Sequence, residues 1–328
     1  MIDKSGMVHG GLAVAAIGLA TWAWLSPAGK ADDTDVMVLA GKPDEVREVR
    51  WVDADSEVTV SRAADKGVLV AVTSKKALAS NATASNAPTP AAAPVRTRVF
   101  PGTDAARELT GKLVPFRASR DLGPMAADKA VAFGLAGNPA KLTVSFGERA
   151  ETLEVGGTSF GGGSTYVRAG GRVYLVKTTT FNDLKNGASG LTERALIVVP
   201  REKIERVVVR EGGKSREVVQ RFADDRAKSY YADPAEPDKR LPEVTNWLER
   251  LMRTRIVDFA DQKPQGEPQL VVELEGDRKP LGAVKVWAAG DAAMALVEAT
   301  AFQGVVTIPK ATAETLLRDV EAVLGEAK

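Results

Sequence analysis

Residues 150–176 read AETLEVGGTSFGGGSTYVRAGGRVYLV. Their pattern indicates the kind of structure that a large part of the chain forms. The flanks AETLEV and TYVRAGGRVYLV alternate apolar and polar residues with a period of two, and AGG is typical of a tight turn. These residues predict successive strands of an antiparallel meander. Gly156 to Ser164 then form a mobile or bulged hairpin connection between two of the strands.

Two chemical interpretations compete with the hairpin. Gly157 to Gly161 matches the G-x-S-x-G pattern of a serine hydrolase, but no helix pattern follows Ser159 and the only histidine of the chain is His9. A Ser-His-Asp hydrolase is therefore excluded, whereas a Ser-Lys pair is not. A phosphate-binding loop is also excluded, because it requires a lysine before the hydroxyl residue and Gly163-Ser164-Thr165 has none.

Without a catalytic set, the glycine-rich loop remains a candidate contact site that closes over a ligand or a partner. The residues that we assign to this contact are Gly161, Gly162, Gly163, Ser164, Tyr166 and Arg168. A second candidate is the paired Tyr230 and Tyr231, which stand among charges and prolines in a predicted exposed loop. These tyrosines either contact a protein or cover an edge of the sheet.

Composition limits the possible functions. The 328 residues include 44 Lys and Arg against 43 Asp and Glu, so the near-zero net charge argues against a nucleic-acid partner. There is no cysteine, which removes disulfides, thiolate catalysis and cysteine-based metal sites. The single histidine removes mixed histidine and carboxylate sites as well. We expect no metal, no cofactor and no catalytic residue.

The N-terminal segment predicts the location of the protein. Residues 8–25 carry no Asp, Glu, Lys or Arg and end with Trp22 and Trp24, as an interfacial anchor would. Residues 1–30 are therefore predicted to be a membrane anchor, with a cleaved signal peptide as the alternative. The expected arrangement is a single pass through the inner membrane, with the N-terminus cytoplasmic and the remaining domains periplasmic.

Beyond this segment the chain is predicted to contain two related α+β domains, each a mostly antiparallel sheet with packed helices. Val46 to Arg62 alternates as a hairpin, and residues 76–94 form an Ala/Pro-rich insertion of flexible composition. The order of hairpin, amphipathic helix, four strands and closing helix occurs twice. The corresponding segments are 44–62 with 202–221, 103–123 with 241–261, 138–157 with 267–287, and 164–184 with 293–317. The predicted domains are residues 36–190 and 195–328.

The chain also resembles a bacterial family known as domain of unknown function 4340. The resemblance rests on Phe133-Gly134-Leu135, Pro139, Tyr166-Val167-Arg168 and Val173-Tyr174-Leu175-Val176. It is closer in the first half, because the second half lacks the Tyr-Val-Arg motif. Similar proteins combine a membrane anchor with repeats and are often associated with ABC transporters of the gliding-motility type. The family has no established activity or catalytic residues, so the resemblance implies an accessory role and assigns no site.

These observations predict a non-enzymatic, extracytoplasmic accessory or scaffold subunit of a cell-envelope complex. The expected partners are envelope or transporter membrane proteins. An alternative is a periplasmic module that binds cell-wall glycan or an exported substrate in the cleft between the halves or at a sheet edge. An enzyme would be favoured by Lys177 or Lys185 placed beside Ser159 or Ser164.

Overall fold

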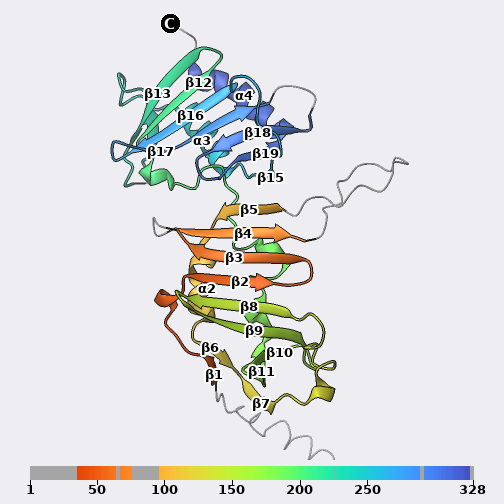
Figure 1. The fold of residues 1–328 in the computed structure, drawn as a ribbon. Coiled ribbons are helices and arrows are strands. Elements are labelled where there is room, and N and C mark those ends of the chain that lie inside the picture. Colours follow the sequence, from red (N-terminus) through yellow and green to blue (C-terminus); the bar gives the residue numbers. More distant parts are fainter. Residues whose placement is uncertain (1–34, 64–66, 76–95, 226, 289–291, 326–328) are drawn as a thin grey trace, which may run out of the picture.

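The computed structural model describes residues 35–63, 67–75, 96–225, 227–288 and 292–325. Three antiparallel sheets account for most of this part of the chain (Figure 1). The nine-stranded sheet has the order β5-β4-β3-β2-β8-β9-β10-β11-β7. Its strands are β2 (Glu48–Val52), β3 (Ser56–Arg62), β4 (Val68–Ser74), β5 (Arg96–Pro101), β7 (Arg120–Pro124), β8 (Ala140–Phe146), β9 (Arg149–Thr158), β10 (Ser164–Ala169) and β11 (Arg172–Lys177).

The second large sheet has eight strands in the order β14-β13-β12-β16-β17-β18-β19-β15. They are β12 (Arg206–Glu211), β13 (Lys214–Arg221), β14 (Tyr230–Ala232), β15 (Asp258–Phe259), β16 (Leu270–Gly276), β17 (Lys279–Trp287), β18 (Met294–Ala299) and β19 (Val305–Pro309). A small third sheet pairs β1 (Val36–Leu39) with β6 (Phe116–Ala118).

Helical segments pack against these sheets. The α-helices are α2 (Asp104–Leu113), α3 (Pro242–Arg253) and α4 (Lys310–Leu324). The short 3-10 segments are η1 (Pro43–Glu45), η2 (Ala127–Lys129), η3 (Thr178–Phe181), η4 (Asn186–Ala188) and η5 (Arg201–Lys203). The two large sheets share one connectivity, because β3-β2-β8-β9-β10-β11 and β13-β12-β16-β17-β18-β19 have the same order, with β7 and β15 at corresponding edges.

Each large sheet buries its own core. In the first, Trp51, Phe116 and Phe181 are fully buried, and the Phe181 ring lies 5.7 Å from Trp51 and 6.0 Å from Phe116. In the second, the side chains of β16 alternate between buried and partly exposed, as a strand with one covered face requires. There the Trp247 indole N–H of α3 donates to the Leu316 carbonyl of α4 at 3.0 Å, which joins the two covering helices.

The predicted α+β class with an N-terminal anchor is wrong, because the described chain is mostly β-sheet. One source of the error is the closing helix expected within residues 164–184. Thr178 to Phe181 form only the 3-10 segment η3, since consecutive threonines are weak helix formers, whereas α4 in the second half is rich in Ala, Leu and Glu.

The predicted membrane location also needs correction. None of the helices in the described ranges has the length and apolar character needed to span a bilayer. The anchor expected at residues 1–30 lies outside the described residues, as does the Ala/Pro-rich insertion at residues 76–94. The single-pass inner-membrane arrangement with periplasmic domains is therefore unsupported and is not retained.

The two large sheets meet edge to edge, with β5 of the first facing β15 of the second (Figure 1). The Arg98 guanidinium pairs with the Asp258 carboxylate at 2.6 Å, and Arg96 pairs with Asp261. At the same junction, the Phe100 ring belongs to the second core and packs edge-on against Phe259, with ring centroids 5.2 Å apart. This junction combines charge pairing with aromatic packing.

A segment that includes Phe133, Gly134 and Leu135 crosses β9 at two glycines. The Gly157 N–H donates to the Phe133 carbonyl at 2.8 Å. A methyl group at Gly156 would lie 2.3 Å from that same carbonyl oxygen, so only glycine permits the crossing.

We predict that Gly156→Ala destabilises the protein by about 1–3 kcal/mol, because the added carbon must push the crossing segment off β9. Gly163→Ala is the matched control, since a methyl group there meets no atom within 4 Å. Urea unfolding of both variants tests this prediction. Equal stability of the two variants would contradict it.

Candidate functional site

The glycine-rich loop between β9 and β10 is a hydrogen-bonded turn. The Ser159 N–H donates to the Ser164 carbonyl at 2.7 Å, and the Gly162 N–H donates to the Ser159 carbonyl at 3.0 Å. The pairing of β9 with β10 shifts register between Thr165 and Val167, which is the irregularity expected of a bulged hairpin. The interpretation as a bulged strand connection is confirmed.

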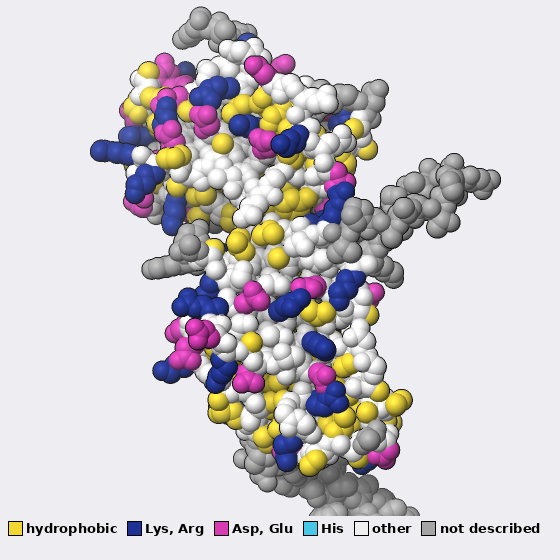
Figure 2. Space-filling model, viewed as in Figure 1, with side chains coloured by type: hydrophobic (Ala, Val, Ile, Leu, Met, Phe, Trp, Pro, Cys, Tyr) yellow, Lys and Arg dark blue, Asp and Glu magenta, His cyan; other side chains and the backbone are white. Residues whose placement is uncertain are grey.

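An apolar surface lies at this end of the first sheet. Phe160 at the tip of the loop is fully exposed (108%), and Val131 is 78% exposed. The Phe133 ring stacks on Tyr166, with ring centroids 4.2 Å apart, and the Phe133 carbonyl accepts from the Gly157 N–H near the start of the loop. Figure 2 shows hydrophobic side chains gathered towards this end of the molecule. We call Val131, Phe133, Phe160 and Tyr166 the loop-end surface.

The structure brings together some of the residues assigned to the first contact site. Gly161, Gly162, Gly163 and Ser164 form the turn, and Tyr166 follows it on β10. Arg168 lies on the same strand but pairs with Glu154 of β9, which raises the pKa of the arginine. Its guanidinium is engaged within the sheet and is not free to bind a ligand.

A Ser-Lys pair gains little support from the geometry. Ser164 and Lys177 are cross-strand neighbours on β10 and β11, but no hydrogen bond joins their side chains and Lys177 is exposed. A lysine that acts as a base needs a desolvated environment, which lowers its pKa. Lys185 instead places its ammonium 6.0 Å from the centre of the Phe181 ring.

Tyr230 and Tyr231 are buried in β14 and are not exposed in a loop. The expectation of an accessible pair is wrong because this segment forms a short edge strand beside β13. The Tyr230 hydroxyl donates to the Pro237 carbonyl at 3.2 Å. No hydrogen bond of ordinary geometry reaches the Tyr231 hydroxyl from the described residues. Burial raises its pKa to about 12, whereas the charge of Arg201 and a weak polar contact with its guanidinium act in the opposite direction.

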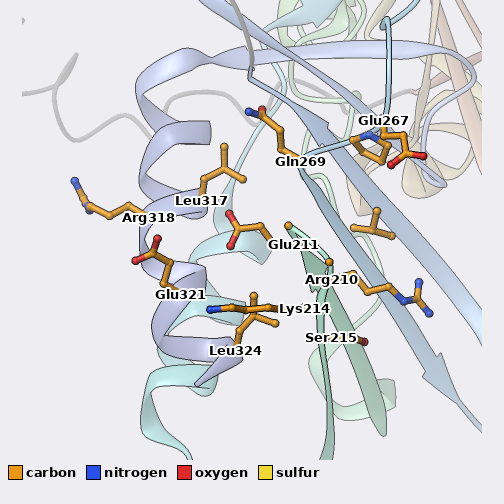
Figure 3. A pocket seen from close by; sticks show the side chains of 14 residues that line it. Arg210, Glu211, Lys214, Ser215, Glu267, Gln269, Leu317, Arg318, Glu321 and Leu324 are labelled. Atoms are coloured by element: carbon orange, nitrogen blue, oxygen red, sulfur yellow. The ribbon is translucent and has the colours of Figure 1, made fainter. Parts of the chain in front are cut away.

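A cleft of about 1050 Å³, which no local sequence pattern indicates, lies beside α4 (Figure 3). Its walls are the second half of α4, the turn between β12 and β13, and the segment that leads into β16. Glu211, Lys214 and Glu321 point into the same space. Burial, and secondly repulsion from Glu321, raise the pKa of Glu211, whereas Lys214 lowers it.

No sequence signal connects these residues, because α4 and the turn are about a hundred residues apart in the chain. In the described ranges, no cluster of three or more Asp, Glu, His or Cys side chains is placed to hold a metal ion. The two sites thus differ in chemistry: the loop-end surface is apolar, and the cleft combines charged walls with leucine side chains.

We predict that Tyr231→Phe leaves the stability unchanged or raises it by about 1 kcal/mol, because it removes a buried hydroxyl that has no hydrogen bond of ordinary geometry within the described residues. Tyr230→Phe is the control and should cost about 0.5–1.5 kcal/mol through its lost hydrogen bond. Chemical unfolding compares the two. A larger loss for Tyr231→Phe would mean that its hydroxyl is satisfied.

We further predict that Glu211→Gln raises the melting temperature near pH 7 by a small amount, on the order of 1–3 °C. The raised pKa means that the ionised form of Glu211 lowers the free energy of unfolding. This loss of stability is absent below the ordinary glutamate pKa, where the side chain is protonated in both states. It grows as the pH rises through the pKa that Glu211 has in the folded protein. The gain should therefore disappear near pH 4. Glu314→Gln, an exposed site on the same helix, should give no gain in thermal denaturation at either pH.

Comparison with known proteins gives one match. Neither the curated proteins nor the solved structures compared with the chain contain a similar protein. Residues 117–270 match the family described as "Domain of unknown function (DUF4340)". The matched region runs from β6 to the first residue of β16, and therefore includes the glycine-rich loop, Phe133-Gly134-Leu135 and the tyrosine pair. Over these residues the chain is similar to the DUF4340 family.

Proposed function

We propose that the protein is a non-catalytic accessory or scaffold subunit that docks another protein on its loop-end surface. The observation that carries this proposal is the full exposure of Phe160 on a turn fixed by hydrogen bonds. Single exposed aliphatic residues are common on protein surfaces, but a completely exposed phenylalanine favours an interaction site.

The loop-end surface has the properties of a preorganised contact. Backbone hydrogen bonds from Gly162 and Thr178 fix the loop, so little conformational entropy is lost when Phe160 enters a partner pocket. At the same end of the sheet, the stacked rings of Phe133 and Tyr166 add a second aromatic element to the loop-end surface. Aromatic side chains supply much of the binding energy in protein interfaces.

The partner that we propose is a component of a cell-envelope complex, and the first to test is an ABC transporter of the gliding-motility type. The support for this partner is the family resemblance. The contact surface itself does not depend on the identity of the partner.

A second candidate function is ligand binding, and the cleft beside α4 favours it. Its volume of about 1050 Å³ lies at the upper end of the range for ligand sites. This candidate uses the second sheet and is independent of Phe160.

We predict that a photo-reactive phenylalanine analogue at position 160 of the full-length chain crosslinks to a defined partner in the native cells. The same analogue at Phe222, which is 57% exposed in the second half, is the matched control and should not capture that partner. Mass spectrometry of the crosslinked species identifies the protein.

The captured protein is then purified and its affinity measured directly. Phe160→Ser should weaken binding at least tenfold, as expected for truncation of a central aromatic anchor, and Phe222→Ser should not. Equal affinity for both variants would refute docking at the loop-end surface. A captured protein unrelated to envelope or transporter complexes would refute only the proposed partner.

A further inference from the structure

The cleft beside α4 presents two carboxylates that have no salt bridge to any residue that the structure describes. Glu211 ends β12 and Glu321 lies on the last turn of α4, and both side chains point into the same space (Figure 3). Across the described ranges neither forms a salt bridge, whereas the neighbouring Arg210 is held by Glu273 at 2.8 Å. The Lys214 side chain points into the same space and lowers the pKa of Glu211.

The remaining charged residues of the walls are Arg318 and Glu267. Arg318 pairs with Asp319 at 3.2 Å and projects away from the carboxylates on the outer side of α4. Glu267, which forms no salt bridge within the described chain, adds a further carboxylate at the other end of the cleft. Among the described residues that line the cleft, the charges without a salt bridge are therefore three carboxylates and one ammonium, and a cationic ligand would complement them.

Keeping Glu211 in this position has a cost. Burial and the nearby Glu321 both oppose its ionisation. Residues that lower stability and make no compensating structural contact are concentrated at functional sites. A bound cation would remove the repulsion between the two carboxylates.

The same cleft has an apolar floor. Leu317 and Leu324 of α4 are only partly buried and line it beside the carboxylates. A lysine or arginine side chain matches this combination, because its aliphatic stem packs on apolar surface and its charged head reaches polar groups. A bare metal ion would make no favourable contact with the leucine side chains. A purely apolar ligand would leave the negative charge of the carboxylates without a counter-charge.

We propose that this cleft binds a segment of a partner protein in which lysine or arginine residues alternate with apolar residues. The basic side chains pair with Glu211 and Glu321, and the apolar side chains contact Leu317 and Leu324. The volume of about 1050 Å³ is at the upper end for small-molecule sites and suits a peptide segment of several residues. The site lies on the second sheet and does not depend on docking at the loop-end surface.

The test measures binding of a fluorescein-labelled peptide with three Lys-Leu repeats to the full-length protein by fluorescence anisotropy. Peptides with three Glu-Leu or three Lys-Ser repeats separate the contributions of charge and apolar contact. We expect the Lys-Leu peptide to bind at physiological salt and the other two to bind at least tenfold more weakly. Failure of the Lys-Leu peptide to bind, or equal binding of the Glu-Leu peptide, would overturn the proposal.

Variants then locate the binding. The double variant Glu211→Gln/Glu321→Gln should weaken the Lys-Leu peptide about tenfold, as expected for loss of charged contacts. Glu314→Gln on the outer face of the same helix and Phe160→Ser on the loop-end surface should leave the affinity unchanged. Circular dichroism confirms that each variant is folded. An affinity that falls with either control, or that survives the double substitution, would place the peptide elsewhere.

Discussion

Each large antiparallel sheet has two edge strands, and the covering of these edges determines how the molecule is assembled. An uncovered edge offers unpaired backbone groups to any other chain. The inner edges cover each other, since β5 of the first sheet lies against β15 of the second. Arg98 and Asp258 contribute an ion pair there, and Phe100 extends from the first sheet to pack on Phe259. Phe259 in turn packs against Phe302 at 6.1 Å, so the contact continues into the second core.

The outer edges are protected in other ways. On β7, Gly123 has a positive φ and the pairing with β11 shifts register, which interrupts the regular ladder. The adjacent Pro124 has no backbone N–H that could pair with another strand. On β14 the Leu241 N–H donates to the Tyr231 carbonyl at 2.9 Å, which brings the entry to α3 against the strand. An extended peptide added to a sheet edge, one of the modes that the sequence suggests, is therefore less favoured than binding at a loop or a cleft.

The sequence predicts local structure well and long-range contacts poorly in this chain. The hairpin at residues 46–62 is confirmed as β2 and β3, and the glycine-rich link as a bulged connection, because both depend on alternation and turn residues within a short window. The burial of Tyr231 could not be predicted, since a three-residue strand among charges and prolines leaves no periodic pattern. The approach of Glu211 to Glu321 depends on how α4 crosses the second sheet, which no local pattern records.

The edge-to-edge junction also relates the two candidate sites to each other. The loop-end surface belongs to the first sheet and the cleft to the second, and the Phe100, Phe259 and Phe302 rings connect the sheets through packed side chains. Packed aromatic contacts resist rearrangement more than a flexible linker does. Two segments of a partner bound to one such chain would be held at a fixed separation, and binding of the first would raise the effective concentration of the second. A scaffold gains affinity from this geometry without any catalytic group, and the cost is that both segments must match the separation that the junction sets.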